Sequence, residues 1–212
     1  MPLFKHLKFN NHQLAIWKVD ETVDELLQEA DLSQADLEKL NTFKHEPRKK
    51  EWLTARVLVK IITGKPLQII YTPSGKPFFK DNSAHLSITH CKGFVGVTIS
   101  TQPTALDMEI VAQRIAPIHN RFINEKELAF IPDHQKLAYF TLIWSAKETL
   151  YKLFDKQQVI FKDHLLIEPF QLNQQGTIQA LFSFNEIHEK IEINYITRPE
   201  FTLVYYFKPA HS

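Results

Sequence analysis

The sequence predicts an α+β fold with antiparallel sheets. Two long segments, residues 48–63 and 135–155, carry apolar residues at the spacing of an amphipathic helix. In each half of the chain, such a segment is followed by short stretches with the features of β-strands. No stretch rich in Gly, Ser or Pro separates the halves, so we expect them to pack directly on each other. Helices followed by strands, twice over, favour an α+β architecture with a loose internal duplication.

The first half is expected to contain three helices before its strands. Ser33, with Asp36 three residues later, indicates the capped start of one helix. Pro47 favours the start of the next helix and Gly64 its end. The expected helices span residues 22–29, 33–44 and 48–63, and the expected strands span residues 12–19, 67–71, 86–89, 94–100 and 105–111.

The second half is expected to be organised around one helix at residues 135–155. A loop with Pro117 leads to a shorter helix near residues 124–130, where Asn124 and Glu127 have the spacing of a capping box. The strands expected after the long helix span residues 164–167, 178–184, 189–196 and 201–207.

Composition bounds the class of protein. Of the 212 residues, 44% are hydrophobic and the formal net charge is +1, which predicts a globular protein with no global charge for binding nucleic acid or membranes. Cys91 is the single cysteine, no apolar run has membrane-spanning length, and Met1–Lys8 has too short an apolar stretch for a signal peptide, so we expect a cytoplasmic protein. Gly is scarce, and no Gly-rich nucleotide loop is present.

Three carboxylates form the main candidate site. Asp107 and Glu109 lie two apart on an expected strand, so they project from the same face. Apolar neighbours indicate that this strand is at least half buried, where paired charges are costly without a cation. With Glu148 from the long helix, the two could surround Mg²⁺, which prefers oxygen ligands. The alternative for Asp107 and Glu109 is an edge strand with a solvated acidic face.

The block Trp144-Ser145-Ala146-Lys147-Glu148 contains a stripe of unusual composition. Trp144, Glu148 and Lys152 are successive i, i+4 positions and therefore share one side of the helix. The alternative to a functional stripe is a surface Glu–Lys pair beside a half-buried Trp, which contributes a few tenths of a kcal/mol.

Basic residues supply a second candidate group. Arg48 and Arg56 lie on the helix of residues 48–63, Lys76 lies in a Gly-Lys-Pro turn, and His90 follows Thr89 at a strand end. Each could be a surface charge, or a structural histidine in the case of His90. Together with a metal site they could bind phosphates. No zinc spacing or Ser/His/Asp nucleophile signature is present, so the inventory favours metal-assisted phosphoryl-type transfer.

With these residues in place, the chain resembles the surfactin-type (Sfp-like) 4′-phosphopantetheinyl transferases. Three ordered blocks carry the resemblance: Leu86-Ser87-Ile88-Thr89-His90-Cys91, Ala105-Leu106-Asp107-Met108-Glu109, and Trp144-Ser145-Ala146-Lys147-Glu148 with Lys152. The segment from Arg48 to Arg56 and the Gly75-Lys76-Pro77 turn also resemble family landmarks. The resemblance covers residues 48 to 152, and two positions depart from the family pattern: Ala105 stands where a Gly is usual, and the His90 loop keeps only its His.

The resemblance implies a pseudo-dimer of two similar halves, residues 1–104 and 105–212, with coenzyme A (CoA) bound between them. Asp107, Glu109 and Glu148 would hold Mg²⁺, and Lys152 would bind the phosphates and stabilise the leaving group. The residues around the 3′-phosphoadenosine end would be Arg48, Arg56, Lys76 and His90, and Thr89 would offer CoA a hydroxyl group.

The activity implied is that of a holo-acyl-carrier-protein synthase. Glu148 would take a proton from a serine of an acyl or peptidyl carrier protein, and the products would be the holo carrier and 3′,5′-ADP. The internal duplication predicts a monomer. The segment from Pro117 to Pro132, with apolar Phe122, Ile123, Leu128 and Phe130, could contact the carrier or could be ordinary core.

Two alternatives stay open at this point. One is a non-catalytic module that binds CoA or a carrier protein, motivated by Ala105 and the altered His90 loop. The other is an Mg²⁺-dependent hydrolase of phosphoesters, which would release products with no carrier present.

Overall fold

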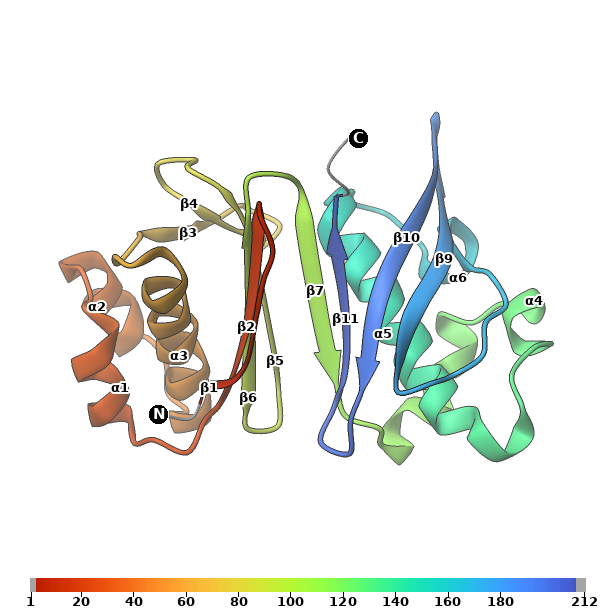
Figure 1. Cartoon of the computed structure of the whole chain (residues 1–212), viewed down its shortest axis with the longest axis horizontal. Helices are drawn as coiled ribbons and strands as arrows, with labels where there is room; N and C mark the ends of the chain where they lie inside the picture. The colour runs from red at the N-terminus through yellow and green to blue at the C-terminus, as the bar shows by residue number, and fades with distance from the viewer. Residues whose placement is uncertain (1–2, 209–212) are drawn as a thin grey trace. The chain divides into compact units, whose positions relative to one another are not determined.

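The chain folds into two compact α+β units, Met1–Thr104 and Ala105–Ser212. The computed structural model describes residues 3–208, so Met1, Pro2 and residues 209–212 at the ends of the two predicted halves lie outside the described residues. Each unit combines helices with a sheet (Figure 1), which confirms the predicted fold class. A pseudo-dimer relation between the units stays a prediction.

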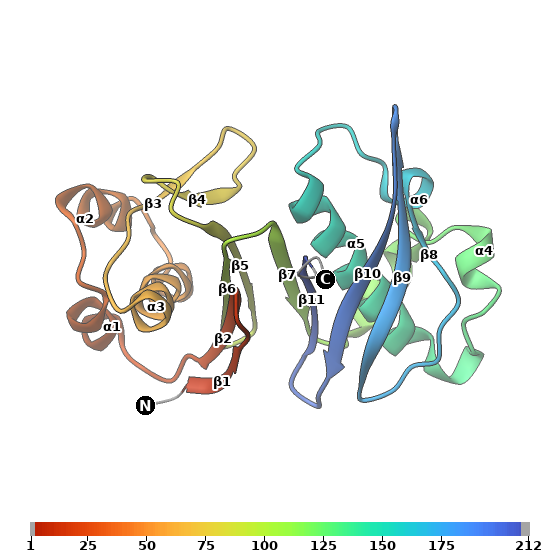
Figure 2. The same ribbon diagram turned by 45° about the horizontal axis from the view of Figure 1, so that its top comes forward.

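Three helices lie on one face of the sheet in the first unit (Figures 1 and 2). The sheet has the strand order β1-β2-β6-β5, and each neighbouring pair is antiparallel. A separate antiparallel pair, β3 with β4, follows the third helix. The elements of this unit are β1 (Leu3–Lys8), β2 (His12–Lys18), α1 (Val23–Ala30), α2 (Gln34–Asn41), α3 (Glu46–Thr63), β3 (Ile69–Tyr71), β4 (Pro77–Phe79), β5 (His85–Cys91) and β6 (Phe94–Ser100).

Capping residues fix the helix ends as the sequence predicts. The Ser33 hydroxyl accepts a hydrogen bond from the Asp36 backbone N–H at the start of α2. Pro47 lies in the first turn of α3. Backbone N–H groups in that turn have no partner within the helix, so the N–H that proline lacks costs no helical hydrogen bond. Gly64 ends α3 with φ of 75°, a conformation that a residue with a Cβ adopts with strain. Helix α3 contributes more buried residues to the core of this unit than any other element, among them Leu53 and Leu58.

The second unit is organised around α5. Its sheet has the order β7-β11-β10-β9-β8, and α5 packs against β11 and β8. Strand β7 begins at Thr104, the last residue of the first unit. The elements are β7 (Thr104–Glu109), the 3-10 helix η1 (Gln113–Arg121), α4 (Glu125–Leu128), η2 (Asp133–Gln135), α5 (Lys136–Phe154), α6 (Phe161–His164), β8 (Leu165–Ile167), β9 (Gln175–Phe184), β10 (Ile187–Thr197) and β11 (Thr202–Phe207).

Five short elements were not predicted: β1, β4, η1, η2 and α6. Strand β1 has no deeply buried side chain, so its apolar pattern is weak. Strand β4 has three residues and begins at Pro77. Helix η1 contains Pro117, so the expected loop is a 3-10 helix instead, and the single-turn helix α6 ends at His164, where the sequence predicted the start of a strand. Among residues 3–208, no helix combines the length and apolar character that crossing a membrane requires.

Candidate active site

Strand β7 holds the first two carboxylates of the site in the second unit. Asp107 is only 6% exposed and Glu109 is half-buried, with the buried Met108 between them. Alternation along the strand directs both carboxylates to one face. Burial raises the pKa of Glu109, and the negative charge of Asp107 raises it further, while Arg114 and Trp144 oppose that shift. The two acids are therefore electrostatically coupled.

Glu148 brings a third carboxylate to the same place from α5. Burial raises the pKa of Glu148 to about 7, with the charge of Asp107 as the next largest cause and Glu109 adding to it. Lys152, one turn further along the helix, acts in the opposite direction. The shift shows that α5 turns Glu148 toward both carboxylates of β7. A carboxylic acid with this pKa can gain or lose a proton near neutral pH.

Asp107 is fixed by two side chains of α5. Lys152 donates from Nζ to Oδ1 of Asp107 at 2.8 Å and to the carbonyl oxygen of Leu106 at 3.1 Å. Ser145 donates from its hydroxyl to Oδ2 of Asp107 at 2.9 Å. The helix and the strand are thus joined at both oxygens of one carboxylate, and charge-assisted hydrogen bonds of this kind are stronger than neutral ones.

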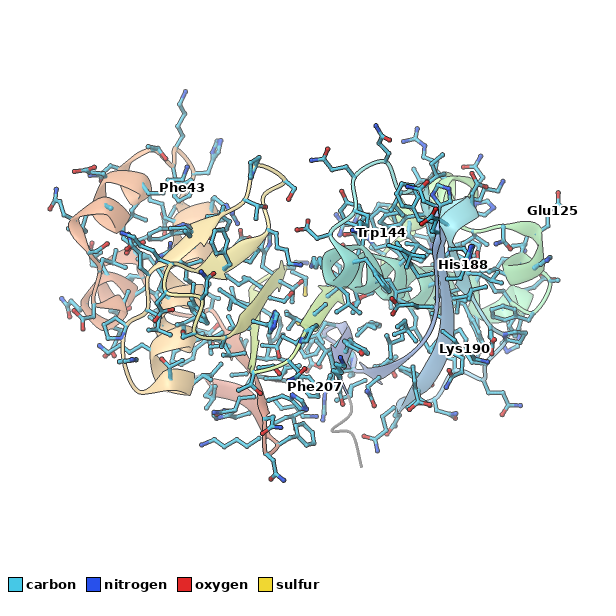
Figure 3. The ribbon with its side chains drawn as sticks, turned by 90° about the horizontal axis from the view of Figure 1, so that it is seen from above. Phe43, Glu125, Trp144, His188, Lys190 and Phe207 are labelled. Atoms are coloured by element: carbon cyan, nitrogen blue, oxygen red, sulfur yellow. The ribbon has the colours of Figure 1, made fainter. Side chains whose placement is uncertain are left out.

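Glu109 has two donors of its own. The indole N–H of Trp144, which projects from α5 (Figure 3), donates to this carboxylate. Arg114, in η1, donates to Oε2 of Glu109 at 2.9 Å. The stripe of Trp144, Glu148 and Lys152 therefore lies over the two acids of β7, as a shared helix side requires.

The donor set fits a hard divalent cation. The negative charge of Asp107 raises the pKa of both Glu109 and Glu148, and that of Glu109 raises the pKa of Glu148 further, so a cation among these carboxylates would stabilise their ionised forms. Within residues 3–208, no three His, Cys, Asp or Glu side chains are gathered closely enough to hold a metal by themselves. Mg²⁺ is usually bound by one or two carboxylates together with water and substrate phosphates, so this set suits Mg²⁺.

A buried ion pair anchors α5 to the neighbouring elements. Lys147 and Glu127 are both fully buried, with Nζ of Lys147 lying 2.7 Å from Oε1 of Glu127. Lys147 also donates to the carbonyl oxygens of Phe122 and Phe161, and Glu127 accepts from the backbone N–H of Ile167. Burial lowers the pKa of Lys147, and Glu127 opposes this. The pair thereby connects α4, α5 and β8.

In the first unit, two of the predicted basic residues meet. Nη1 of Arg48 lies 3.2 Å from Nε2 of His90, so this ring nitrogen accepts from the guanidinium. Glu51 lies beside both, 3.2 Å from Arg48 and 3.3 Å from Nδ1 of His90. The guanidinium of Arg48 also lies over the ring of Phe43. Arg48 and His90 are both exposed, and Glu51 is paired with each of them near the start of α3.

Arg56 lies elsewhere and is buried. Its Nε donates to Oδ1 of Asp36 at 2.9 Å, its Nη1 donates to the carbonyl oxygen of Trp52, and its guanidinium also bonds the Tyr71 side chain. The guanidinium stacks on the Trp52 ring, 3.1 Å from its centre. Arg48 is eight residues away, which is about 12 Å along a helix. The structure does not bring Arg56 to Arg48 and His90.

The other two predicted CoA contacts are Lys76 and Thr89. Lys76 acts on the charge of His85, at the start of β5, whereas His90 is near the end of that strand. Five residues of strand span about 16 Å. Thr89 precedes His90 in β5, so their side chains point to opposite faces of the sheet.

The apolar segment considered for carrier binding is partly core. Phe122 and Ile123 are buried in the core of the second unit, and Phe130 packs against that core. Leu128 is 40% exposed. The core interpretation is therefore correct for Phe122 and Ile123. At Ala105, φ is not positive, so its methyl group sits in an ordinary strand conformation.

The sequence analysis missed two residues of the carboxylate cluster. Ser145 is part of the tryptophan block and lies three residues before Glu148, which places it on a neighbouring part of the helix surface. That spacing was the available signal. Arg114 follows Glu109 by five residues in a 3-10 helix that the sequence did not indicate, so no pattern pointed to it.

Comparison with known proteins connects this cluster to one family. Residues 103–201 match the family described as the 4′-phosphopantetheinyl transferase superfamily. The 4′-phosphopantetheinyl transferase gsp of Aneurinibacillus migulanus is 23% identical over 141 residues, which cover 64% of this chain and 57% of that protein. The matched range contains Asp107, Glu109, Glu148 and Lys152, the residues that the second unit brings together. Through residues 103–201, the chain is therefore similar to the 4′-phosphopantetheinyl transferase superfamily.

Proposed function

We propose that the protein transfers the 4′-phosphopantetheine group of CoA to a serine of an acyl or peptidyl carrier protein, in an Mg²⁺-dependent, Sfp-like reaction. The observation that carries this proposal is the coupled carboxylate cluster of β7 and α5 inside the family-matched range. The three acids would otherwise repel the phosphates of CoA, so the site makes chemical sense with a cation present.

Asp107, Glu109 and Glu148 are the residues that would hold Mg²⁺, and the ion would neutralise charge on the pyrophosphate of CoA. Lys152 lies beside Asp107 and would contact the same phosphates, stabilising charge on the departing group. Its ammonium has three donors, of which Asp107 and Leu106 use two.

Glu148 would act as the base, directly or through a water molecule. Mg²⁺ beside Glu148 would lower the pKa of this carboxylate and make it a weak base, so we expect positioning and charge neutralisation to supply most of the rate. The serine oxygen attacks the β-phosphorus of CoA, a serine O–P bond forms, and the bond from that phosphorus to the 3′,5′-ADP oxygen breaks. The proton goes to Glu148, and 3′,5′-ADP leaves.

We assign the 3′-phosphoadenosine end of CoA to Arg48 and His90, which are in contact and exposed. Lys76 and Thr89 would make separate contacts with CoA. Arg56 was predicted to be a further contact. Because its donors reach Asp36, Trp52 and Tyr71, we assign it a supporting role in α3 instead.

The test is mass spectrometry of an apo acyl carrier protein incubated with the protein, CoA and Mg²⁺. We expect the carrier to gain one phosphopantetheine group, and the gain to disappear with EDTA. Glu148→Gln should slow transfer about 100-fold or more. Glu186→Gln, an exposed turn acid of the same unit, is the matched control and should transfer normally.

Two outcomes would contradict the proposal. Retention of CoA without modification of fatty-acid, polyketide, peptide or aminoadipate-type carriers would favour a binding module. Normal transfer by Glu148→Gln would show that Glu148 is neither the base nor a required ligand of Mg²⁺.

A further inference from the structure

Three buried hydroxyl groups follow one another at one-turn intervals along α5: Thr141, Ser145 and Thr149. Thr141 donates to the carbonyl oxygen of Leu137 at 2.8 Å, four residues earlier. Thr149 donates to the carbonyl oxygen of Ser145 at 2.8 Å, again four residues earlier. This local bond is the usual one for a hydroxyl inside a helix.

Ser145 differs from the other two in donating to a side chain, whereas the hydroxyls of Thr141 and Thr149 donate only to backbone carbonyl oxygens, which for Thr149 include that of Val204 in β11. The Ser145 hydroxyl reaches out of the helix to Oδ2 of Asp107, 38 residues away in sequence, at 2.9 Å. Both groups are buried, with Ser145 fully buried and Asp107 only 6% exposed. A hydrogen bond to a buried charged acceptor is stronger than one to a neutral carbonyl. Ser145 of α5 thus binds one carboxylate of the cluster on β7, that of Asp107.

The bond restricts how Asp107 can present its oxygens. Lys152 occupies one lone pair of Oδ1, and Ser145 occupies one of Oδ2. With a donor at each oxygen, rotation of the carboxylate plane would break a hydrogen bond. The directions in which Asp107 can ligate a cation are therefore set by α5.

We propose that Ser145 is a positioning residue that orients Asp107 for binding a divalent cation. This inference rests on the proposed role of Asp107 as a metal ligand. Partners that orient metal ligands typically change metal affinity by 10-fold to 100-fold when they are removed. The hydroxyl of Ser145 touches neither the phosphates nor the carrier serine in this assignment, and acts through Asp107.

The test measures Mn²⁺ binding to the full-length protein, without CoA or carrier, by electron paramagnetic resonance of the free ion. Ser145→Ala should weaken Mn²⁺ binding about 10-fold. Thr149→Val is the matched control, because it removes a buried hydroxyl of the same helix that bonds only backbone oxygens, and it should bind Mn²⁺ within about twofold of wild type. Circular dichroism melts would show that each variant is folded.

Ser145→Cys is the second variant, in case the alanine variant does not fold. It preserves more of the side-chain volume but offers only a weak donor, so it should also weaken Mn²⁺ binding. In transfer assays, Ser145→Ala should raise the Mg²⁺ concentration needed for half-maximal rate more than it lowers the rate at saturating Mg²⁺.

Wild-type affinity in Ser145→Ala, or equal losses in Ser145→Ala and Thr149→Val, would overturn the inference, as would a wild-type protein that binds no Mn²⁺. Failure of the proposed function looks different: no carrier is modified, yet Mn²⁺ binding still depends on Ser145.

Discussion

Glu148 is largely buried beside two negatively charged side chains, and together these raise its pKa to about 7. The ionised form of Glu148 therefore destabilises the folded protein. The folded state keeps the proton up to about pH 7, whereas the unfolded chain releases it near 4.5. The folded state therefore binds more protons between these values, and its free energy of unfolding falls as the pH rises from about 4.5 to about 7. Above pH 7 this contribution is constant and unfavourable.

Replacing this acid by its amide should therefore stabilise the metal-free protein. We expect Glu148→Gln to raise the free energy of unfolding at pH 8 by about 2 to 3 kcal/mol, with a much smaller gain at pH 5. Urea unfolding in EDTA at both pH values measures this, with Glu186→Gln as the control. If Glu148→Gln is no more stable than wild type at pH 8, ionised Glu148 does not destabilise the folded protein.

Arg48 and Arg56 lie on the same helix and look alike in sequence, but the structure gives them different surroundings. We expect Arg48→Ala to raise the KM for CoA about tenfold with little change in stability, because the side chain is exposed and would contact a phosphate. Arg56→Met should instead lower the free energy of unfolding by about 3 kcal/mol, because it leaves Asp36 largely buried without its cation.

Kinetics with varied CoA, together with urea unfolding of both variants, separate the two roles. Loss of CoA affinity in Arg56→Met with unchanged stability would return Arg56 to the binding surface. Loss of stability alone in Arg48→Ala would remove Arg48 from it.

At the scale of elements, the buried ion pair of Lys147 and Glu127 anchors α5 to its neighbours. We expect Lys147→Met to lower the free energy of unfolding by about 3 to 5 kcal/mol, because Glu127 would be left charged in the core. Adding Glu127→Gln should recover part of that loss, since the amide is neutral. Thermal and urea melts measure the effect, and Lys156→Met, exposed just after α5, should change stability by less than about 0.5 kcal/mol.

An additive double variant, or a harmless Lys147→Met, would contradict this account of how α5 is anchored. A positive coupling would support it, because residues that form one ion pair are not energetically independent.

The elements that sequence predicts best are those whose local pattern is strong. Helices α3 and α5 have long apolar stripes, and Ser33 and Gly64 mark helix ends, so their positions follow from periodicity and capping chemistry. Strand β1 lacks deeply buried residues, and η1 contains Pro117, which is typical of a loop. Neither segment therefore shows the clear apolar periodicity of a strand or a helix. Local pattern cannot reveal those elements because their positions depend on tertiary contacts.

The same division applies to the site. The spacing of Asp107 and Glu109 on a strand, and of Trp144, Glu148 and Lys152 on a helix, can be read locally. The bond from Ser145 to Asp107 joins residues 38 positions apart, and no local rule predicts it. Nor does sequence distinguish Arg56, which turns into the core beside Trp52, from the exposed Arg48.

At the scale of the whole molecule, each unit has its own hydrophobic core. Leu58 is fully buried in the first and Leu142 in the second, so either Leu→Ala change should cost about 2 to 5 kcal/mol. We expect hydrogen exchange to accelerate first in the unit that carries the substitution, because local stability follows local packing. Equal acceleration throughout residues 3–208 from Leu142→Ala would contradict the separation into two cores.

The family match and the carboxylate cluster both fall in the second unit, and the exposed pair of Arg48 and His90 falls in the first. The central claim is that Asp107, Glu109 and Glu148 support transfer of an intact group to a carrier, with 3′,5′-ADP as the second product. The most direct measurement quantifies both products in one reaction of apo carrier, CoA, Mg²⁺ and enzyme. The account predicts one 3′,5′-ADP for each phosphopantetheine found on a carrier serine, and neither product with Asp107→Asn. Release of 3′,5′-ADP with no gain of mass on any carrier, or undiminished transfer by Asp107→Asn, would contradict it.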